Sequence, residues 1–136
     1  MKKIIIGFIC THNSCRSIMA EGYAKHLASN MFEVYSAGTE SYPAPKPLAI
    51  EVMEDVAIDM AQSYSKLLDE IPSELDILIT MGCGVECPFV PTKHREDWGL
   101  DDPSGGPKAG FELTRDLIKA KVLDLIERIN NNNLKG

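Results

Sequence analysis

Apolar runs and helical spacings of apolar residues alternate along the chain. Ile4–Ile9 is an apolar run with the length and β-branched content of a buried parallel strand. After a short polar stretch, Met19, Tyr23 and Leu27 recur at helical spacing and predict a helix over Ile18–Ser29. The chain thus opens with a strand, a tight polar turn and a helix.

The rest of the chain continues this alternation. We expect strands over Phe32–Ser36 and Leu75–Thr80, a short strand near Glu96–Trp98, and a loop over Thr39–Pro47. We expect helices over Pro47–Val56, over Lys66–Ile71, where it is short, and over Ala109–Asn130, where it is long. The helix over Pro47–Val56 has an apolar face made of Ala49, Val52, Met53 and Val56. Such alternation predicts an α/β fold, a three-layer structure with a four-stranded parallel sheet and helices on both faces. Ligands bind beyond the carboxyl ends of such strands, where Cys10 and Cys83 are expected to meet.

The turn between the first strand and helix, Cys10–Ser17, has the pattern C-x5-R-S. Ser17 stands where a helix N-cap is expected, so main-chain N–H groups and the helix dipole would converge on a bound oxyanion. Arg16 would grip that anion bidentately, and the same groups would stabilise a thiolate on Cys10. The candidate binding residues are Thr11, His12, Asn13, Ser14, Cys15, Arg16 and Ser17. Taken singly, Cys10 would be a small buried hydrophobe and Arg16 a surface charge; together they indicate catalysis.

Composition narrows the class of protein. A chain of 136 residues with 44% hydrophobic residues fits one domain, residues 1–136. The net charge of −6 argues against nucleic acid or an anionic membrane as a partner. No apolar run approaches the roughly 20 residues of a membrane span, and the run after Met1 is too short for a signal peptide. We therefore expect a cytoplasmic protein, whose four cysteines are more often catalytic, redox-active or metal-binding than structural.

Three stretches together resemble the low-molecular-weight protein tyrosine phosphatase fold family. They are Cys10-Thr-His-Asn-Ser-Cys-Arg-Ser-Ile-Met-Ala-Glu-Gly22, Val34-Tyr-Ser-Ala-Gly38 and Trp98-Gly-Leu-Asp-Asp-Pro103. The first is most similar to the thioredoxin-coupled arsenate reductase branch. The resemblance implies that Cys10 is the nucleophile and Asp102 the general acid, although Asp before Pro is also ordinary turn chemistry. Ser104-Gly-Gly106 follows the proline where the phosphatase branch has tyrosines, which weakens a phosphotyrosine interpretation.

The second informative stretch is Cys83-Gly-Val-Glu-Cys87. From the residues alone, its thiols could be zinc ligands, inert buried groups or a redox pair. The resemblance implies the redox pair. Cys83 would attack an arsenate ester on Cys10, and Cys87 would then move the disulfide outward for thioredoxin to reduce.

The resemblance therefore implies an arsenate reductase. The alternatives are a tyrosine or small-molecule phosphatase that uses Cys10, Arg16 and Asp102, and an oxyanion-binding module without turnover. We expect arsenate or phosphate as the ligand, thioredoxin as the partner, a monomer, and no metal or tightly bound cofactor. In some related reductases, counterparts of Asn13, Glu21 and Ser36 join an aspartate around potassium; Lys66 would replace that aspartate, so we expect no potassium dependence. His26 and His94 are expected at the surface, and Trp98 is expected to pack.

Overall fold

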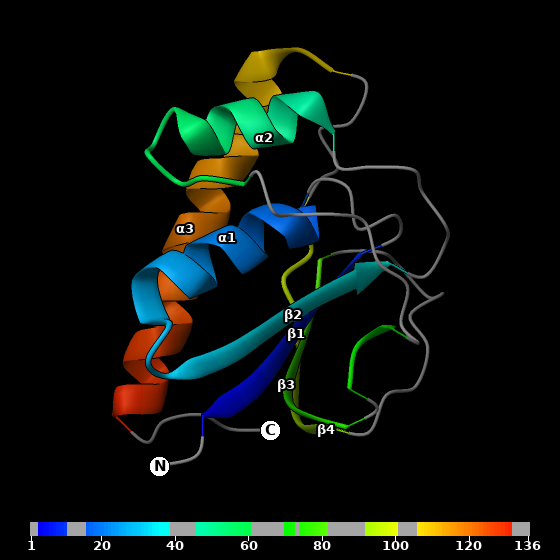
Figure 1. The fold of residues 1–136 in the computed structure, drawn as a ribbon, viewed down its shortest axis with the longest axis vertical. Coiled ribbons are helices and arrows are strands. Elements are labelled where there is room, and N and C mark those ends of the chain that lie inside the picture. The colour runs from blue at the N-terminus through cyan, green and yellow to red at the C-terminus, as the bar shows by residue number, and fades with distance from the viewer. Residues whose placement is uncertain are drawn as a thin grey trace.

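The computed structural model describes residues 3–10, 16–38, 46–60, 70–72, 74–81, 92–100 and 106–131. Within these ranges the elements are β1 (Ile4–Cys10), α1 (Arg16–Ala28), β2 (Phe32–Gly38), α2 (Pro47–Glu54), β3 (Leu75–Thr80), β4 (Thr92–Asp97) and α3 (Lys108–Asn130). The strands form one four-stranded sheet in the order β2-β1-β3-β4, and all pair in parallel (Figure 1). The predicted α/β fold with a four-stranded parallel sheet is confirmed.

The strand register aligns the carboxyl ends of all four strands. Cys10 pairs with Gly38, and Thr80 pairs with both Ile9 and Asp97. One residue past β3, the Met81 N–H donates to the Ile9 carbonyl at 3.0 Å. The chain that leaves β3 therefore starts beside Cys10, as the sequence predicts for neighbouring parallel strands.

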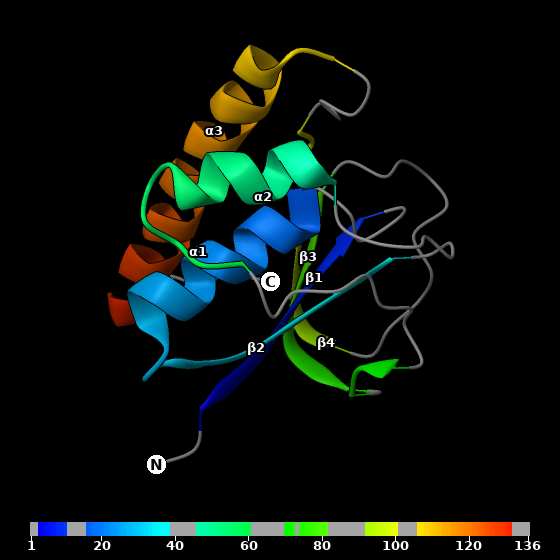
Figure 2. The ribbon, with the colours of Figure 1, turned by 45° about the horizontal axis from the view of Figure 1, so that its top comes forward.

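The three helices lie on one face of the sheet (Figures 1 and 2). Their apolar residues join the inward side chains of the strands in the main core, which includes Ile6, Phe8, Ile77, Ile79, Met19, Val52, Phe111, Ile118 and Leu125. Gly22 allows α1 to approach the chain around α2, because a Cβ there would lie 2.7 Å from Met60 Sδ and 2.9 Å from Met53 Cε. None of the helices in the described ranges is long and apolar enough to cross a lipid bilayer.

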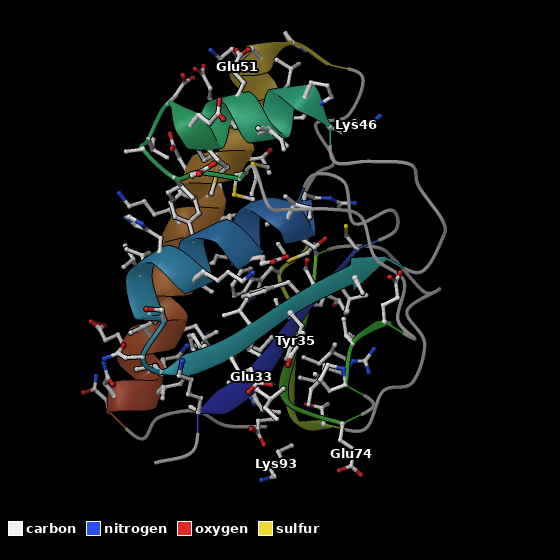
Figure 3. All side chains as sticks on the ribbon, viewed as in Figure 1. Glu33, Tyr35, Lys46, Glu51, Glu74 and Lys93 are labelled. Atoms are coloured by element: carbon white, nitrogen blue, oxygen red, sulfur yellow. The ribbon has the colours of Figure 1, made fainter. Side chains whose placement is uncertain are left out.

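The other face of the sheet carries a smaller apolar cluster. Its buried members are Ile9, Ala37, Ile71, Leu75 and Leu78. Tyr35 packs against this cluster, and Figure 3 shows it beside Glu33, whose carboxylate accepts a hydrogen bond from the tyrosine hydroxyl. Most of the predicted helix Lys66–Ile71 lies outside the described residues. The predicted helices are therefore confirmed on one face of the sheet, and a helix on the other face stays a prediction.

Several predicted element boundaries were wrong. β2 continues to Gly38, because Ala37 and Gly38 pair with the last two residues of β1 rather than forming a turn. Helix α1 begins at Arg16 and leaves Leu27 37% exposed, so Leu27 lies at the edge of the apolar face. Residues 39–45 of the expected loop Thr39–Pro47 lie outside the described residues.

Helix α2 ends two residues before the predicted end. The Ile58 N–H reaches back to the Met53 carbonyl at 3.0 Å, and the Ala57 N–H donates to the Glu54 carbonyl at 2.9 Å. Ala57 has a φ of 65°, the left-handed conformation that ends many helices. Val56 lies on this turn and is 38% exposed, so it does not extend the apolar face.

Strand β4 begins earlier than predicted. Its start was missed because every side chain in Thr92–Asp97 is polar. It lies at the sheet edge, where charged residues are common because they discourage pairing with another chain. Lys93 and Arg95 are exposed, and Figure 3 shows Lys93 and Glu74 at the amino-terminal end of the sheet. His94 is only 7% exposed, so the prediction of a surface histidine was wrong; the alternation of a strand turns it inward.

Candidate active site

Cys10 lies at the carboxyl end of β1 and is 3% exposed. Its Sγ is 2.9 Å from the Ser17 hydroxyl, which comes from the first turn of α1 and is fully buried. Because α1 begins at Arg16, Ser17 lies inside the helix rather than at the predicted N-cap. A hydroxyl in this position can donate a hydrogen bond to the sulfur.

The Arg16 side chain is buried at the start of α1, with 6% of the residue exposed. Its Nη1 donates to the main-chain oxygens of Met81 at 2.5 Å and Leu100 at 2.7 Å. These two acceptors use both hydrogens of Nη1, so a bidentate grip on an oxyanion would use the Nε and Nη2 edge. The alternative that Arg16 is a surface charge is wrong.

The two carbonyls mark the chain segments that lead to the other predicted catalytic residues. Met81 directly follows β3, and Cys83 comes two residues later in the sequence. Leu100 follows β4 and stands two residues before Asp102. Arg16 thus bonds to a residue that precedes each of these two predicted catalytic residues, so Met81 and Leu100 both lie beside its guanidinium.

The structure brings together three of the predicted site residues: Cys10, Arg16 and Ser17. The others lie outside the described residues, namely Thr11, His12, Asn13, Ser14, Cys15, Cys83, Cys87 and Asp102. The zinc, inert-thiol and redox interpretations of the Cys83 stretch therefore stay predictions.

A buried carboxylate lies on α1, four residues after Ser17. Glu21 is 5% exposed; the Ser36 hydroxyl donates to its Oε1, and Lys25 Nζ lies 2.6 Å from its Oε2. Lys25 therefore supplies an ammonium group to this carboxylate. The expectation that Lys66 takes the place of the potassium-binding aspartate falls outside the described residues and stays a prediction. A potassium ion at Glu21 would have to compete with that ammonium.

Replacing Ser17 with alanine tests the hydrogen bond to sulfur. A bond to a charged group contributes roughly 1.5–3 kcal/mol, so Ser17→Ala is expected to slow alkylation of Cys10 by iodoacetamide at pH 7 about tenfold. The rate is measured by mass spectrometry of the Cys10 peptide. Ser29→Ala, at an exposed residue after α1, is the matched control and should alkylate like the wild type. Equal rates in all three proteins would exclude a role for Ser17 in activating the thiol.

A group of polar residues beside the carboxyl end of β4 was not anticipated as part of the site. Glu96 accepts hydrogen bonds from His94, Trp98 and Arg128. The period-two spacing of His94, Glu96 and Trp98 was a usable signal for a strand with one face turned inward. Arg128 carried no such signal, since it comes from α3, 32 residues after Glu96. Trp98 packs against Phe8 with ring centroids 5.8 Å apart, as expected of a packing residue.

Comparison with known proteins agrees with this geometry. The profile of the low molecular weight phosphotyrosine protein phosphatase family matches residues 5–135. The chain belongs to this family. The C-x5-R-S pattern of Cys10–Ser17, the order of the sheet and the burial of Cys10 and Arg16 agree with this membership.

Several similar proteins are arsenate reductases. The arsenate reductase of Staphylococcus aureus (strain Newman) is 44% identical over 126 residues, which cover 90% of this chain and 95% of that protein. A solved structure of an arsenate reductase in the phosphate binding state aligns with a TM-score of 0.85 and 39% identity, covering 94% of this chain and 99% of that chain. A thioredoxin-dependent arsenate reductase of Corynebacterium glutamicum aligns with a TM-score of 0.80 and 30% identity, covering 96% of this chain and 63% of that chain.

Proposed function

We propose that this protein reduces arsenate to arsenite, with Cys10 as the nucleophile and thioredoxin as the final reductant. The observation that carries the proposal is the position of Arg16. It is buried directly before Ser17, the hydrogen-bond partner of Cys10, and it bonds Met81 and Leu100, which precede Cys83 and Asp102. The identity of 44% with the Staphylococcus aureus arsenate reductase supports the choice of substrate.

The first step is attack of the Cys10 thiolate on arsenic. The main-chain amides of residues 11–15 and the Nε and Nη2 groups of Arg16 hold the oxyanion and stabilise the charge that develops on it. A sulfur–arsenic bond forms and an arsenate oxygen leaves as water, with its proton supplied by Asp102. The product is an arsenate ester on Cys10.

The second step transfers electrons between sulfur and arsenic. The Cys83 thiolate attacks the Cys10 sulfur, and the electron pair of the sulfur–arsenic bond leaves with arsenic, which is reduced from As(V) to As(III). Arsenite departs and a Cys10–Cys83 disulfide remains. Cys87 then attacks Cys83, frees Cys10, and leaves a Cys83–Cys87 disulfide for the dithiol of thioredoxin to reduce. Such a cycle suits the reducing cytoplasm, where we place the protein as a monomer.

The short spacing of Cys83 and Cys87 constrains this last exchange. Side chains four residues apart on a helix have Cβ atoms about 5–6 Å apart, whereas a disulfide needs about 3.5–4.5 Å. The segment must therefore leave regular helical geometry, which Gly82 and Gly84 make easier.

Family membership also favours a companion activity, hydrolysis of phosphate esters. Arsenate and phosphate have the same tetrahedral shape and charge, and the Cys10 loop would bind either. Water can complete a phosphatase cycle, so Cys83 and Cys87 are dispensable for it. This difference separates the two activities experimentally.

The test is arsenate-dependent oxidation of NADPH in the presence of thioredoxin and thioredoxin reductase. Cys83→Ser is expected to lose this turnover to background and to keep the hydrolysis of p-nitrophenyl phosphate, because only the reduction needs a second thiol. Cys87→Ser is expected to lose sustained turnover and to accumulate the Cys10–Cys83 disulfide, detectable by mass spectrometry.

Each other outcome has a definite meaning. Wild-type protein that hydrolyses p-nitrophenyl phosphate but never oxidises NADPH with arsenate would be a phosphatase. Wild-type protein that binds phosphate and does neither would be an oxyanion-binding module. Full reduction by Cys87→Ser would mean that thioredoxin attacks the Cys10–Cys83 disulfide directly.

A further inference from the structure

The carboxylate of Glu96 connects α3 with the end of β4. Arg128 donates to both carboxylate oxygens, from Nη1 to Oε2 at 2.5 Å and from Nη2 to Oε1 at 3.0 Å. His94 Nε2 donates to Oε2 at 2.7 Å, and Trp98 Nε1 donates to Oε1 at 3.0 Å. Each oxygen therefore accepts two hydrogen bonds. We refer to Glu96, His94, Trp98 and Arg128 as the Glu96 cluster.

The cluster keeps Glu96 ionised. Burial alone would raise the pKa of this carboxyl, but hydrogen bonds from Arg128, His94 and Trp98 outweigh burial and lower the pKa to about 2. Arg128 is also joined to Asp124 on the surface of α3, with Nε 2.9 Å from Oδ2. The carboxylate is thus a fixed negative charge that orients three donors.

Trp98 connects the Glu96 carboxylate to the chain that follows β4. Its main-chain N–H donates to the Thr80 carbonyl at 2.8 Å, and its ring packs on Phe8 of β1. The next residue, Gly99, has a φ of 58°, a left-handed conformation that favours glycine. Its N–H donates to Asp97 Oδ1 at 3.1 Å. Hydrogen bonds therefore fix the turn after β4 at both Trp98 and Gly99.

At the end of this turn, the Leu100 carbonyl accepts a hydrogen bond from Arg16 Nη1 at 2.7 Å. The chain from Glu96 to Leu100 is therefore held at its start by α3, in its middle by β3 and β1, and at its end by the oxyanion-binding arginine. Asp102 follows two residues later. The direction in which the chain leaves Leu100 depends on these contacts.

We propose that Glu96 is a positioning residue for proton donation by Asp102. The proposal rests on the proposed function, in which Asp102 protonates the leaving oxygen. Replacing the Glu96 carboxylate with an amide leaves one acceptor oxygen and places an NH2 donor where the other members of the Glu96 cluster now donate. The Trp98 indole and the Arg128 guanidinium can then no longer both keep their hydrogen bonds. The turn from Trp98 to Leu100, which leads to Asp102 in the sequence, is then less firmly held. A displacement of about 1 Å at a catalytic group can lower a rate about 100-fold.

Leaving-group dependence tests positioning separately from general destabilisation. Phenyl phosphate has a poor leaving group and needs the proton from the acid, whereas 2,4-dinitrophenyl phosphate has a good one and does not. Glu96→Gln is expected to lower kcat/KM for phenyl phosphate about tenfold more than for 2,4-dinitrophenyl phosphate. We compare variants by the ratio of kcat/KM for 2,4-dinitrophenyl phosphate to kcat/KM for phenyl phosphate. Asp102→Asn removes the acid and therefore gives the largest ratio that loss of proton donation can produce.

The matched control is Asp124→Asn. It removes the other ion pair of Arg128, on a carboxylate that is 63% exposed, and leaves the four hydrogen bonds to Glu96. The ratio of the two kcat/KM values in this variant is expected to equal that of the wild type. If Glu96→Gln does not fold, Trp98→Phe decides, because it removes the indole N–H and keeps a smaller aromatic ring against Phe8.

The outcomes separate the inference from the function on which it rests. If Asp102→Asn changes the ratio and neither Glu96→Gln nor Trp98→Phe does, Glu96 only stabilises the fold and the inference is wrong. If Asp102→Asn itself leaves the ratio unchanged, the acid was misassigned in the proposed function and the inference is wrong with it. Arsenate gives a second measurement, since its departing oxygen also needs a proton. An unchanged kcat/KM for arsenate in Glu96→Gln would overturn the inference.

Discussion

Replacing Cys10 with serine is expected to abolish both arsenate reduction and aryl phosphate hydrolysis. A serine hydroxyl stays protonated near neutral pH and cannot form the disulfide through which arsenic is reduced. The fold should tolerate the change, because the smaller hydroxyl can still hydrogen-bond to Ser17, the partner of Cys10 Sγ at 2.9 Å. We expect a change of about 1 kcal/mol or less in the free energy of unfolding. Both activities and urea-induced unfolding are measured on the same preparation.

Phosphate binding supplies the control for this variant. Arg16 and the loop amides are intact in Cys10→Ser, so phosphate should raise its melting temperature as it does for the wild type. Loss of activity with retained binding would identify Cys10 as the nucleophile. Retention of either activity at the wild-type level would show that another group attacks the substrate.

Arg16→Lys is expected to damage both catalysis and stability. Lysine cannot present a planar fork, so it cannot bind two carbonyls with one nitrogen and an oxyanion with the opposite edge. Loss of oxyanion stabilisation typically costs a factor of about 100–1,000 in rate. The two hydrogen bonds to Met81 and Leu100 involve a charged donor, so we expect a loss of about 2–4 kcal/mol in the free energy of unfolding.

The matched control is Arg95→Lys, on the exposed side of β4. Its activity and unfolding free energy should equal those of the wild type. Phosphate should also raise the melting temperature of Arg16→Lys much less than that of the Arg95 variant. An unchanged unfolding free energy in Arg16→Lys would contradict the structural part of this account, and unchanged kcat/KM would contradict the catalytic part.

The sequence was sufficient to predict the centre of the sheet and the Cys10 loop. The central strands are apolar because both faces of β1 and β3 are covered, and this continuous pattern is easily recognised. The strand-turn-helix arrangement around C-x5-R-S then placed Cys10 and Arg16 together, because such a loop is short. Strand β4 was harder to predict: at the sheet edge, its pattern of alternating exposed and inward polar residues resembles a solvated loop.

The contacts that complete the site could not be predicted from sequence patterns. Arg16 binds main-chain oxygens, which every residue carries, so nothing in the sequence marks Met81 and Leu100 as its partners. Glu96 and Arg128 meet only because α3 returns across the sheet to β4. Predicting such pairs requires the packing angle of a helix, which its own periodicity does not specify.

The use of main-chain acceptors has a consequence for how such sites can diverge. Because Met81 and Leu100 contribute only carbonyl oxygens to Arg16, almost any residue at either position could keep the attachment. The chains that continue from these two points can therefore exchange their side chains during evolution while the arginine still holds both. An ancestral protein with this arginine site could in this way acquire thiols in the segment after Met81, or aromatic residues in the segment after Leu100. Its chemistry would change while the contacts of Arg16 stayed the same.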